Sequence, residues 1–257
     1  MMKNKDLILV LLRLFLGYIF FSAGVCKLAE GGFGQLIGPP WLEEALEKHS
    51  LGLFAQVVAI SQVTCGALLL SQRFSLLGTI MLVPMNVAIL AVTVSMNWAG
   101  TPYINAFFLA LNLLMLLLER QKFSFLFQPN ATHRIKPNFT DKIGQHKLSW
   151  LGLLFCLLIM FAARYNLALT NSFAVVIFAS FAFTILSVKG LHHLDKFILG
   201  LPFVAMLIVT FGNLSTLAVP LHVTVLALEA ILLILRIYLS TKEASATKTL
   251  VPDSAEA

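Results

Sequence analysis

Apolar runs separated by short polar segments follow one another along nearly the whole chain. A helix of about 20 residues crosses the roughly 30 Å hydrocarbon core of a bilayer, so each run is a candidate membrane span. The runs lack the alternation of apolar and polar residues typical of membrane barrel strands, which favours helices. The eight candidate spans are Leu7–Val25, Gly52–Ser71, Phe74–Met96, Tyr103–Leu118, Leu148–Ala163, Leu167–Val188, Phe197–Phe211 and Ala218–Leu239. Because the fourth, fifth and seventh runs are short, six or seven spans stay open as alternatives.

Composition points to the same class of protein. Hydrophobic residues make up 59% of the chain and charged residues 12%, against roughly a quarter charged in an average soluble domain. We therefore predict an all-α, polytopic transmembrane helical bundle that has the lipid bilayer as its main surroundings. The expected parts are a four-helix membrane unit (1–118), a basic cytoplasmic loop (119–147), a second transmembrane helical unit (148–239) and a disordered cytoplasmic tail (240–257).

The basic residues are distributed unequally between the two sides of this predicted bundle. Short cytoplasmic loops are enriched in Lys and Arg, which predicts that both termini are cytoplasmic and that the number of spans is even. The inner segments then hold fourteen basic residues, Lys3, Lys5, Arg73, Arg120, Lys122, Arg134, Lys136, Lys142, Lys147, Lys189, Lys196, Arg236, Lys242 and Lys248, and the outer loops hold only Lys27, Lys48 and Arg164. Topology and anionic lipid thus account for the net charge of +6, and no nucleic-acid partner is expected.

The first apolar run also has some features of a cleaved signal peptide. Lys3 and Lys5 precede the run, and small residues follow it. However, Arg13 interrupts the apolar stretch, and the run is longer than a usual signal core. We therefore predict a retained first transmembrane helix.

Residue types that carry redox or metal chemistry are sparse. The three cysteines lie far apart without a C-x-x-C pair, so a dithiol oxidoreductase is disfavoured. His192 and His193 are adjacent, and neighbouring side chains on a helix point about 100° apart, so no metal site is expected there. Only His222 lies in a predicted span, which disfavours haem. We expect no intrinsic cofactor site and no catalytic activity of the chain's own.

Polar residues in the first span form a stripe along one helix face. Arg13, Gly17, Phe20, Gly24 and Lys27 fall within about 40° of one line at 3.6 residues per turn. Gly17, Gly24 and Lys27 therefore predict a helix-packing face, because glycines let a neighbouring helix approach closely. One interpretation has Arg13 extend to the cytoplasmic head groups. The other has it contact an anion or a quinone head group in a cavity between helices.

The remaining candidates for an intramembrane polar site are Asn86, His222 and Glu229. Asn86 follows Pro84, and we expect a kink there with Asn86 hydrogen-bonded across helices, a ligand contact being the alternative. In the last span His222, Glu229 and Arg236 recur every seven residues on one face. We predict that Glu229 pairs with Arg13, since both lie at similar depth. The alternatives are a protonated buried acid and a proton path with His222.

The first-span residues also carry a family resemblance. The first-helix block is Leu12, Arg13, Gly17, Phe20, Phe21, Gly24, Lys27 and Leu28, and further matching residues are Gln62, Gly66, Ala67–Leu70, Arg73, Gly78, Asn97, Trp98, Gly100, Thr101 and Pro102. Over about residues 7–125 the chain resembles the DoxX family of small four-helix proteins of the bacterial cytoplasmic membrane. The resemblance implies association with quinone-linked sulfur oxidation or with thiol and oxidative-stress systems, and quinone as the one cofactor. The chain beyond Lys147 departs from the four-helix pattern.

Two function classes follow from these observations. The first is an accessory membrane subunit of a quinone-linked or redox-stress system, whose redox partner subunit would hold the cofactor. The second is a carrier or binding protein for a lipid or small apolar molecule. Association into a homo-oligomer is left open in both.

Overall fold

The computed structural model describes residues 2–38, 41–123, 139–212 and 217–249, and these residues form helices and connecting loops without strands. The prediction of an all-helical chain is therefore confirmed. Each predicted apolar run coincides with one helix, namely α1 (Asn4–Leu28), α3 (Gly52–Leu70), α4 (Ser75–Ser95), α5 (Thr101–Leu118), α8 (Leu148–Ala162), α9 (Leu167–Leu186), α10 (His193–Thr210) and α11 (Ala218–Thr249). The short elements are α2 (Leu42–Glu47), the 3₁₀ helix η1 (Arg120–Phe123) and α7 (Phe139–Ile143).

Helix length separates α8 from the other apolar helices. Seven helices of the described chain are long and apolar enough to cross a membrane. α8 has 15 residues and therefore measures about 22 Å at a rise of roughly 1.5 Å per residue, short of the hydrocarbon thickness. The chain thus has the helices of a multi-pass membrane protein.

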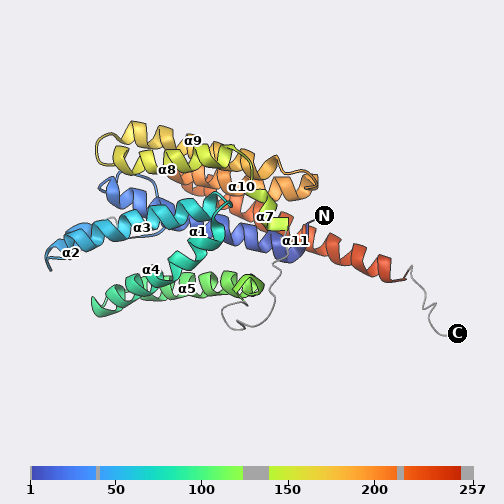
Figure 1. The fold of residues 1–257 in the computed structure, drawn as a ribbon, viewed down its shortest axis with the longest axis horizontal. Coiled ribbons are helices and arrows are strands. Elements are labelled where there is room, and N and C mark those ends of the chain that lie inside the picture. The colour runs from blue at the N-terminus through green and yellow to red at the C-terminus, as the bar shows by residue number, and fades with distance from the viewer. Residues whose placement is uncertain (1, 39–40, 124–138, 213–216, 250–257) are drawn as a thin grey trace.

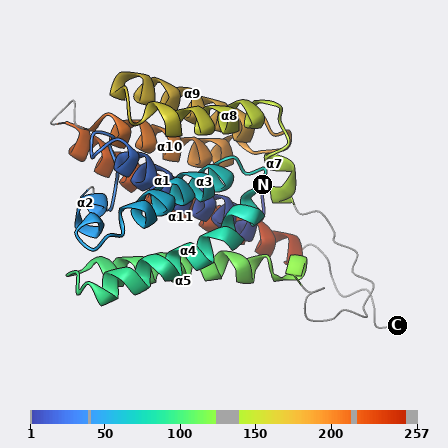
Figure 2. The ribbon, with the colours of Figure 1, turned by 60° about the vertical axis from the view of Figure 1, so that its left-hand side comes forward.

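The helices pack in layers around α1 (Figure 1). α8 and α9 lie on one side of α1 and α3, and α4 and α5 lie on the other, as Figure 2 also shows from a second direction. α1 packs against α3, α5 and α10, whereas α11 packs against α10. A helix that is apolar on all sides is usually buried, and α1 is the most enclosed of the long helices.

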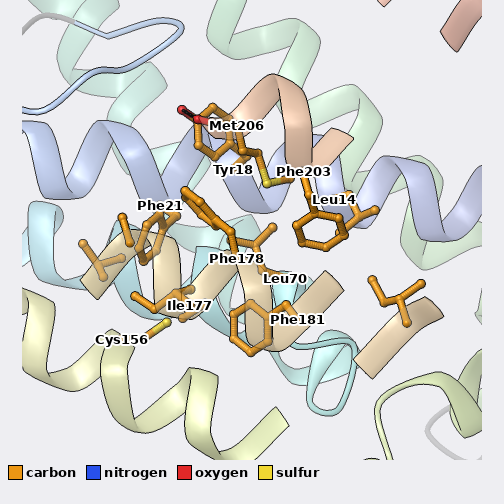
Figure 3. Packing of buried hydrophobic residues seen from close by; sticks show 14 of the residues in the cluster. Leu14, Tyr18, Phe21, Leu70, Cys156, Ile177, Phe178, Phe181, Phe203 and Met206 are labelled. Atoms are coloured by element: carbon orange, nitrogen blue, oxygen red, sulfur yellow. Dashed lines mark hydrogen bonds between the residues drawn. The ribbon is translucent and has the colours of Figure 1, made fainter. Parts of the chain in front are cut away.

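The main apolar core joins the front and rear parts of the chain (Figure 3). The Phe178 ring of α9 makes edge contacts with Tyr18 at 5.8 Å and with Phe21 at 5.9 Å between ring centroids. The Tyr18 hydroxyl donates to the Met206 carbonyl oxygen of α10 at 3.0 Å. The predicted front and rear units consequently share one core through α1.

Glycines permit the close packing of α1 against α3. A Cβ added at Gly24 would lie 2.6 Å from the Ala59 carbonyl oxygen, and one at Gly66 would lie 2.5 Å from the Phe21 amide nitrogen. A Cβ at Gly17 would meet the Leu70 side chain at 3.0 Å. Any larger residue at Gly24 or Gly66 would thus push the two backbones apart.

Asparagines join α4 to α5. The Asn105 side chain donates to the Asn86 backbone carbonyl at 2.8 Å. The Asn112 amide group lies 3.1 Å from both the Thr79 carbonyl oxygen and the amide nitrogen of Val83, the residue before Pro84. The predicted bond across helices therefore involves the backbone of Asn86, not its side chain.

The last helix is longer than its apolar run. α11 continues to Thr249, so the prediction of a disordered tail from Ser240 is wrong for residues 240–249, and residues 250–257 lie outside the described part. The Asn4 side chain at the start of α1 donates to the Ser240 hydroxyl at 3.0 Å. The beginning of the first helix and the second half of the last helix therefore lie together. Of the predicted loop, residues 124–138 also lie outside the described part.

Candidate functional site

Arg13 belongs to a buried ion pair. Its guanidinium lies 2.8 Å from the carboxylate of Glu119, just after α5, and both side chains are almost completely buried. Arg13 also donates to the Gln72 side chain at 3.3 Å. The predicted pair with Glu229 is thus wrong, whereas the extension of Arg13 toward the head groups stays a prediction. The physical reason is that Arg13 faces the ends of α3 and α5, whereas Glu229 lies in a cavity next to α10.

The Arg13 pair extends into a larger charged cluster. The Lys122 ammonium lies 2.6 Å from Glu119 and forms a second ion pair with Asp141 of α7. Glu119 therefore forms ion pairs with two cations, Arg13 at one carboxylate oxygen and Lys122 at the other. The cluster thus links Arg13 of α1 to Glu119 after α5, and Lys122 continues it to Asp141 of α7.

Lys27 is the buried cation without such compensation. Its side chain is only 4% exposed, and its ammonium donates to the Ala23 carbonyl oxygen at 3.0 Å and to the Gln62 side-chain oxygen at 3.1 Å. Both acceptors are neutral. Among the described residues, no carboxylate forms an ion pair with Lys27. An ammonium has three donor hydrogens, so one is left for a further acceptor.

The Lys27 ammonium lies at the edge of an apolar cavity between α1, α3, α4 and α5, which we call the lysine cavity. Its volume is about 680 Å³ including its open mouth. The loop residues Ile37 and Gly38 contribute to the lining. The polar side chains that lie among its apolar and aromatic side chains are Lys27, Gln62, Thr93, Thr101 and Asn105. Its apolar lining includes Ile19, Phe20, Phe54, Val58, Ile89, Val92, Trp98, Ile104 and Phe108. Such a lining suits a molecule with an apolar body and one polar end.

A second, polar hollow meets the other side of Lys27. Lys27 lines it together with residues from the end of α1, the loop after α1, α2 and its flanks, α3 and the turn after α8. These residues are Leu28, Glu30, Gly31, Trp41, Glu44, Glu47, Gln56, Arg164 and Tyr165. Trp41 of this hollow makes an edge contact with Trp98 of the lysine cavity, with ring centroids 4.9 Å apart. Lys27 thus stands at the boundary between a polar hollow and an apolar cavity.

His222 and Glu229 line another cavity, between α1, α10 and α11, which we call the glutamate cavity. Its volume is about 680 Å³ including its opening, and its lining is Leu11, Leu14, Phe15, Tyr18, Ile19, Leu36, Ile37, Pro202, Ala205, Met206, His222, Leu226 and Glu229. Ile19 and Ile37 line the lysine cavity as well, so they form the wall between the two. The Nδ1 atom of His222 is buried and has no hydrogen-bond partner in the described part of the chain.

Arg236 does not share this cavity with the other two residues of its seven-residue series. It forms a fully buried ion pair with Asp195 of α10, with 2.9 Å between the charged atoms. Its guanidinium also donates to the Asn4 side chain and the Met2 carbonyl oxygen, and the Met2 amide donates to Asp195 at 3.0 Å. This cluster ties the start of the chain to α10 and α11.

Of the four predicted polar site residues, the structure brings only His222 and Glu229 together. Arg13 lies in the charged cluster with Glu119, and the fully buried Asn86 side chain has no hydrogen-bond partner among the described residues and lines neither cavity. Gly17 and Gly24 lie at the contact with α3, while Lys27 lines the lysine cavity. Within the described ranges, no group of three or more His, Cys, Asp or Glu side chains could hold a metal ion.

Sequence reasoning did not identify Gln62, Glu119 and Asp195 as partners of the buried cations. Gln62 is a polar residue inside a predicted span, which is itself a signal of an interhelical contact. Glu119 and Asp195 lie within two residues of helix ends, where acidic residues are usually solvated, so nothing in the sequence distinguishes them. Comparison with protein-family models, curated proteins and solved structures finds no match for this chain.

Proposed function

We propose that this protein is a multi-pass membrane protein that binds a long-chain carboxylate in the lysine cavity, with the carboxylate on Lys27 and the chain among the apolar side chains. The observation that carries this proposal is the buried Lys27 ammonium, whose two hydrogen-bond acceptors are both neutral. This corresponds to the second function class, a carrier or binding protein for a lipid or small apolar molecule.

The energetics of Lys27 favour an anionic ligand. An ammonium removed from water without an opposite charge loses hydration that two neutral hydrogen bonds replace only in part. A ligand carboxylate would supply the missing charge and accept the third ammonium hydrogen. A hydrogen bond to a charged group contributes about 1.5–3 kcal/mol, which corresponds to about 10- to 150-fold in affinity.

The topology that we propose has eight crossings, with α8 as the shortest, and both termini on the cytoplasmic side of a bacterial inner membrane. The hydrogen bond between Asn4 and Ser240 supports an even number of crossings, because it holds the first and last helices together at one end. The excess of Lys and Arg in the segments at that end supports its cytoplasmic location. Lys27 then lies near the outer face, next to the polar hollow.

A binding measurement tests the proposal directly. The purified protein in nanodiscs is titrated with oleate, and with oleyl alcohol as an uncharged probe of the same length. We expect Lys27→Met to weaken oleate binding at least 10-fold and to leave oleyl alcohol binding nearly unchanged. The exposed Lys48 serves as the matched control, so Lys48→Met should bind oleate like the parent protein. Equal oleate affinity of the parent protein and Lys27→Met would refute the proposal.

A second candidate function is the accessory subunit of a quinone-linked system. The aromatic side chains Phe20, Phe54, Trp98 and Phe108 of the lysine cavity favour it, because flat rings stack on aromatic faces and quinone carbonyl oxygens accept hydrogen bonds from Lys27. The resemblance to the DoxX family supports the same candidate. Saturable binding of a menaquinone analogue that oleate does not displace would favour the subunit over the carboxylate-binding protein.

A further inference from the structure

We infer that the glutamate cavity is a second ligand site, which takes a lipophilic cation with Glu229 as its counter-ion. This inference does not depend on the function proposed for the lysine cavity, because the two sites use different charged residues. It would give the protein two ligands of opposite charge, held on different faces of α1.

The lining of the glutamate cavity defines the chemistry of its ligand. Apart from His222, Glu229 and Tyr18, the lining residues are aliphatic or aromatic or are proline. The Tyr18 hydroxyl is already hydrogen-bonded to the Met206 carbonyl oxygen and to Thr210, at 3.0 and 3.2 Å. Among the described residues that line this cavity, Glu229 is therefore the one acidic group, and most of its neighbours are apolar.

The basic side chains around this cavity do not compensate Glu229. Arg13 is bound to Glu119, and Arg236 is bound to Asp195. Lys27 lines the lysine cavity on the other side of the wall formed by Ile19 and Ile37. Among the described residues, no ion pair includes Glu229. An ionised carboxylate in this position is costly unless a cation accompanies it, which is the role assigned to the ligand.

The depth of Glu229 excludes the head group of a bilayer lipid as that cation. Glu229 lies eleven residues after the first residue of α11 and seven residues before Arg236, which is about 16 Å and about 10 Å along the helix. These distances place the carboxylate well inside the hydrocarbon layer of the proposed topology. The cation must therefore carry its own apolar body, as tetraphenylphosphonium or a protonated hydrophobic amine does.

His222 provides a second polar contact for a ligand in the glutamate cavity. It lies two turns from Glu229, about 10 Å along α11, so a ligand of two or three ring widths reaches both. The buried Nδ1 atom of His222 has no partner in the described chain. His222 and Leu36 also line a neighbouring hollow, together with Gly34, Gln35, Gly212 and Val219.

The experiment compares two probes of the same shape and opposite charge. Tetraphenylphosphonium and tetraphenylborate are titrated into the purified full chain in nanodiscs, and the saturable component is measured. We expect Glu229→Gln to weaken tetraphenylphosphonium binding at least 10-fold, Glu229→Asp to retain most of it, and the exposed Glu44→Gln to leave it unchanged. Binding of tetraphenylborate should not depend on Glu229.

Two further measurements keep the result interpretable. Glu229→Gln must elute as a single species and unfold at the same sodium dodecyl sulfate content as the parent protein by circular dichroism, which shows that the bundle is intact. Lys27→Met should bind tetraphenylphosphonium normally, so this site is tested independently of the lysine cavity. The inference is overturned if the parent protein shows no saturable tetraphenylphosphonium binding, if an intact Glu229→Gln protein binds the cation as tightly, or if the substitution weakens both probes equally.

Discussion

The ion pair between Asp195 and Arg236 should be one of the largest single contributions to the stability of the bundle. Both side chains are fully buried, with 2.9 Å between the charged atoms, and the pair also binds Met2 and Asn4. Removing one partner of a buried pair leaves an uncompensated charge and costs about 3–5 kcal/mol. We therefore expect Asp195→Asn and Arg236→Met each to lower the free energy of unfolding by about that amount.

The double variant distinguishes a mutual pair from two independent contacts. Once both charges are gone, no buried charge is left unpaired, so the double variant should lose clearly less than the roughly 6–10 kcal/mol that the two single losses would add up to. Unfolding is measured by circular dichroism during titration of detergent micelles with sodium dodecyl sulfate. Lys189→Ala, at an exposed position, is the control and should change stability by less than about 0.5 kcal/mol. Additive losses, or single losses below about 1 kcal/mol, would refute the reasoning.

Three more predictions use the same preparations. Gly66→Ala should lower the free energy of unfolding by at least about 1–3 kcal/mol, because its Cβ would lie 2.5 Å from the Phe21 amide nitrogen of α1. Gly200→Ala is the control and should be neutral or stabilising in the same titration, because the nearest neighbour of its Cβ would lie at 3.9 Å. Tyr18→Phe removes the hydrogen bond to α10 and should cost about 1 kcal/mol by that measurement, so an unchanged midpoint would contradict it. A membrane-impermeant maleimide added to intact cells should label Lys48→Cys and not Lys189→Cys, and the opposite pattern would reverse the proposed topology.

The helices were predictable from the sequence because each long apolar run must form one continuous helix in lipid. The predicted and observed ends agree within four residues for every helix except the end of α11. That helix continues through a polar segment, Ser240 to Thr249, in which Lys, Glu and Ala are good helix formers despite the lack of an apolar pattern. Polarity alone therefore misidentified the end of a helix as a disordered tail.

The partners of the buried charges were not predictable in the same way. An ion pair depends on which helices are neighbours and how each is rotated, and neither follows from the spacing of residues within one helix. Arg13 and Glu229 share a depth, but Arg13 faces Glu119. The stripe on α1 predicted a packing face, yet its last residue, Lys27, lines a cavity that α3, α4, α5 and the loop before α2 complete. Such cavities form only when distant segments meet.

The wall between the two cavities has a consequence for both ligands. Ile19 and Ile37 line both cavities, so a movement of either side chain changes the shape of both. Because the buried Ile19 side chain is closely packed, a rotamer change of Ile19 that makes room for a bulkier ligand in one cavity reduces the room in the other. The carboxylate in the lysine cavity and the cation in the glutamate cavity would then weaken each other's binding through the position of Ile19, without direct contact between the two ligands.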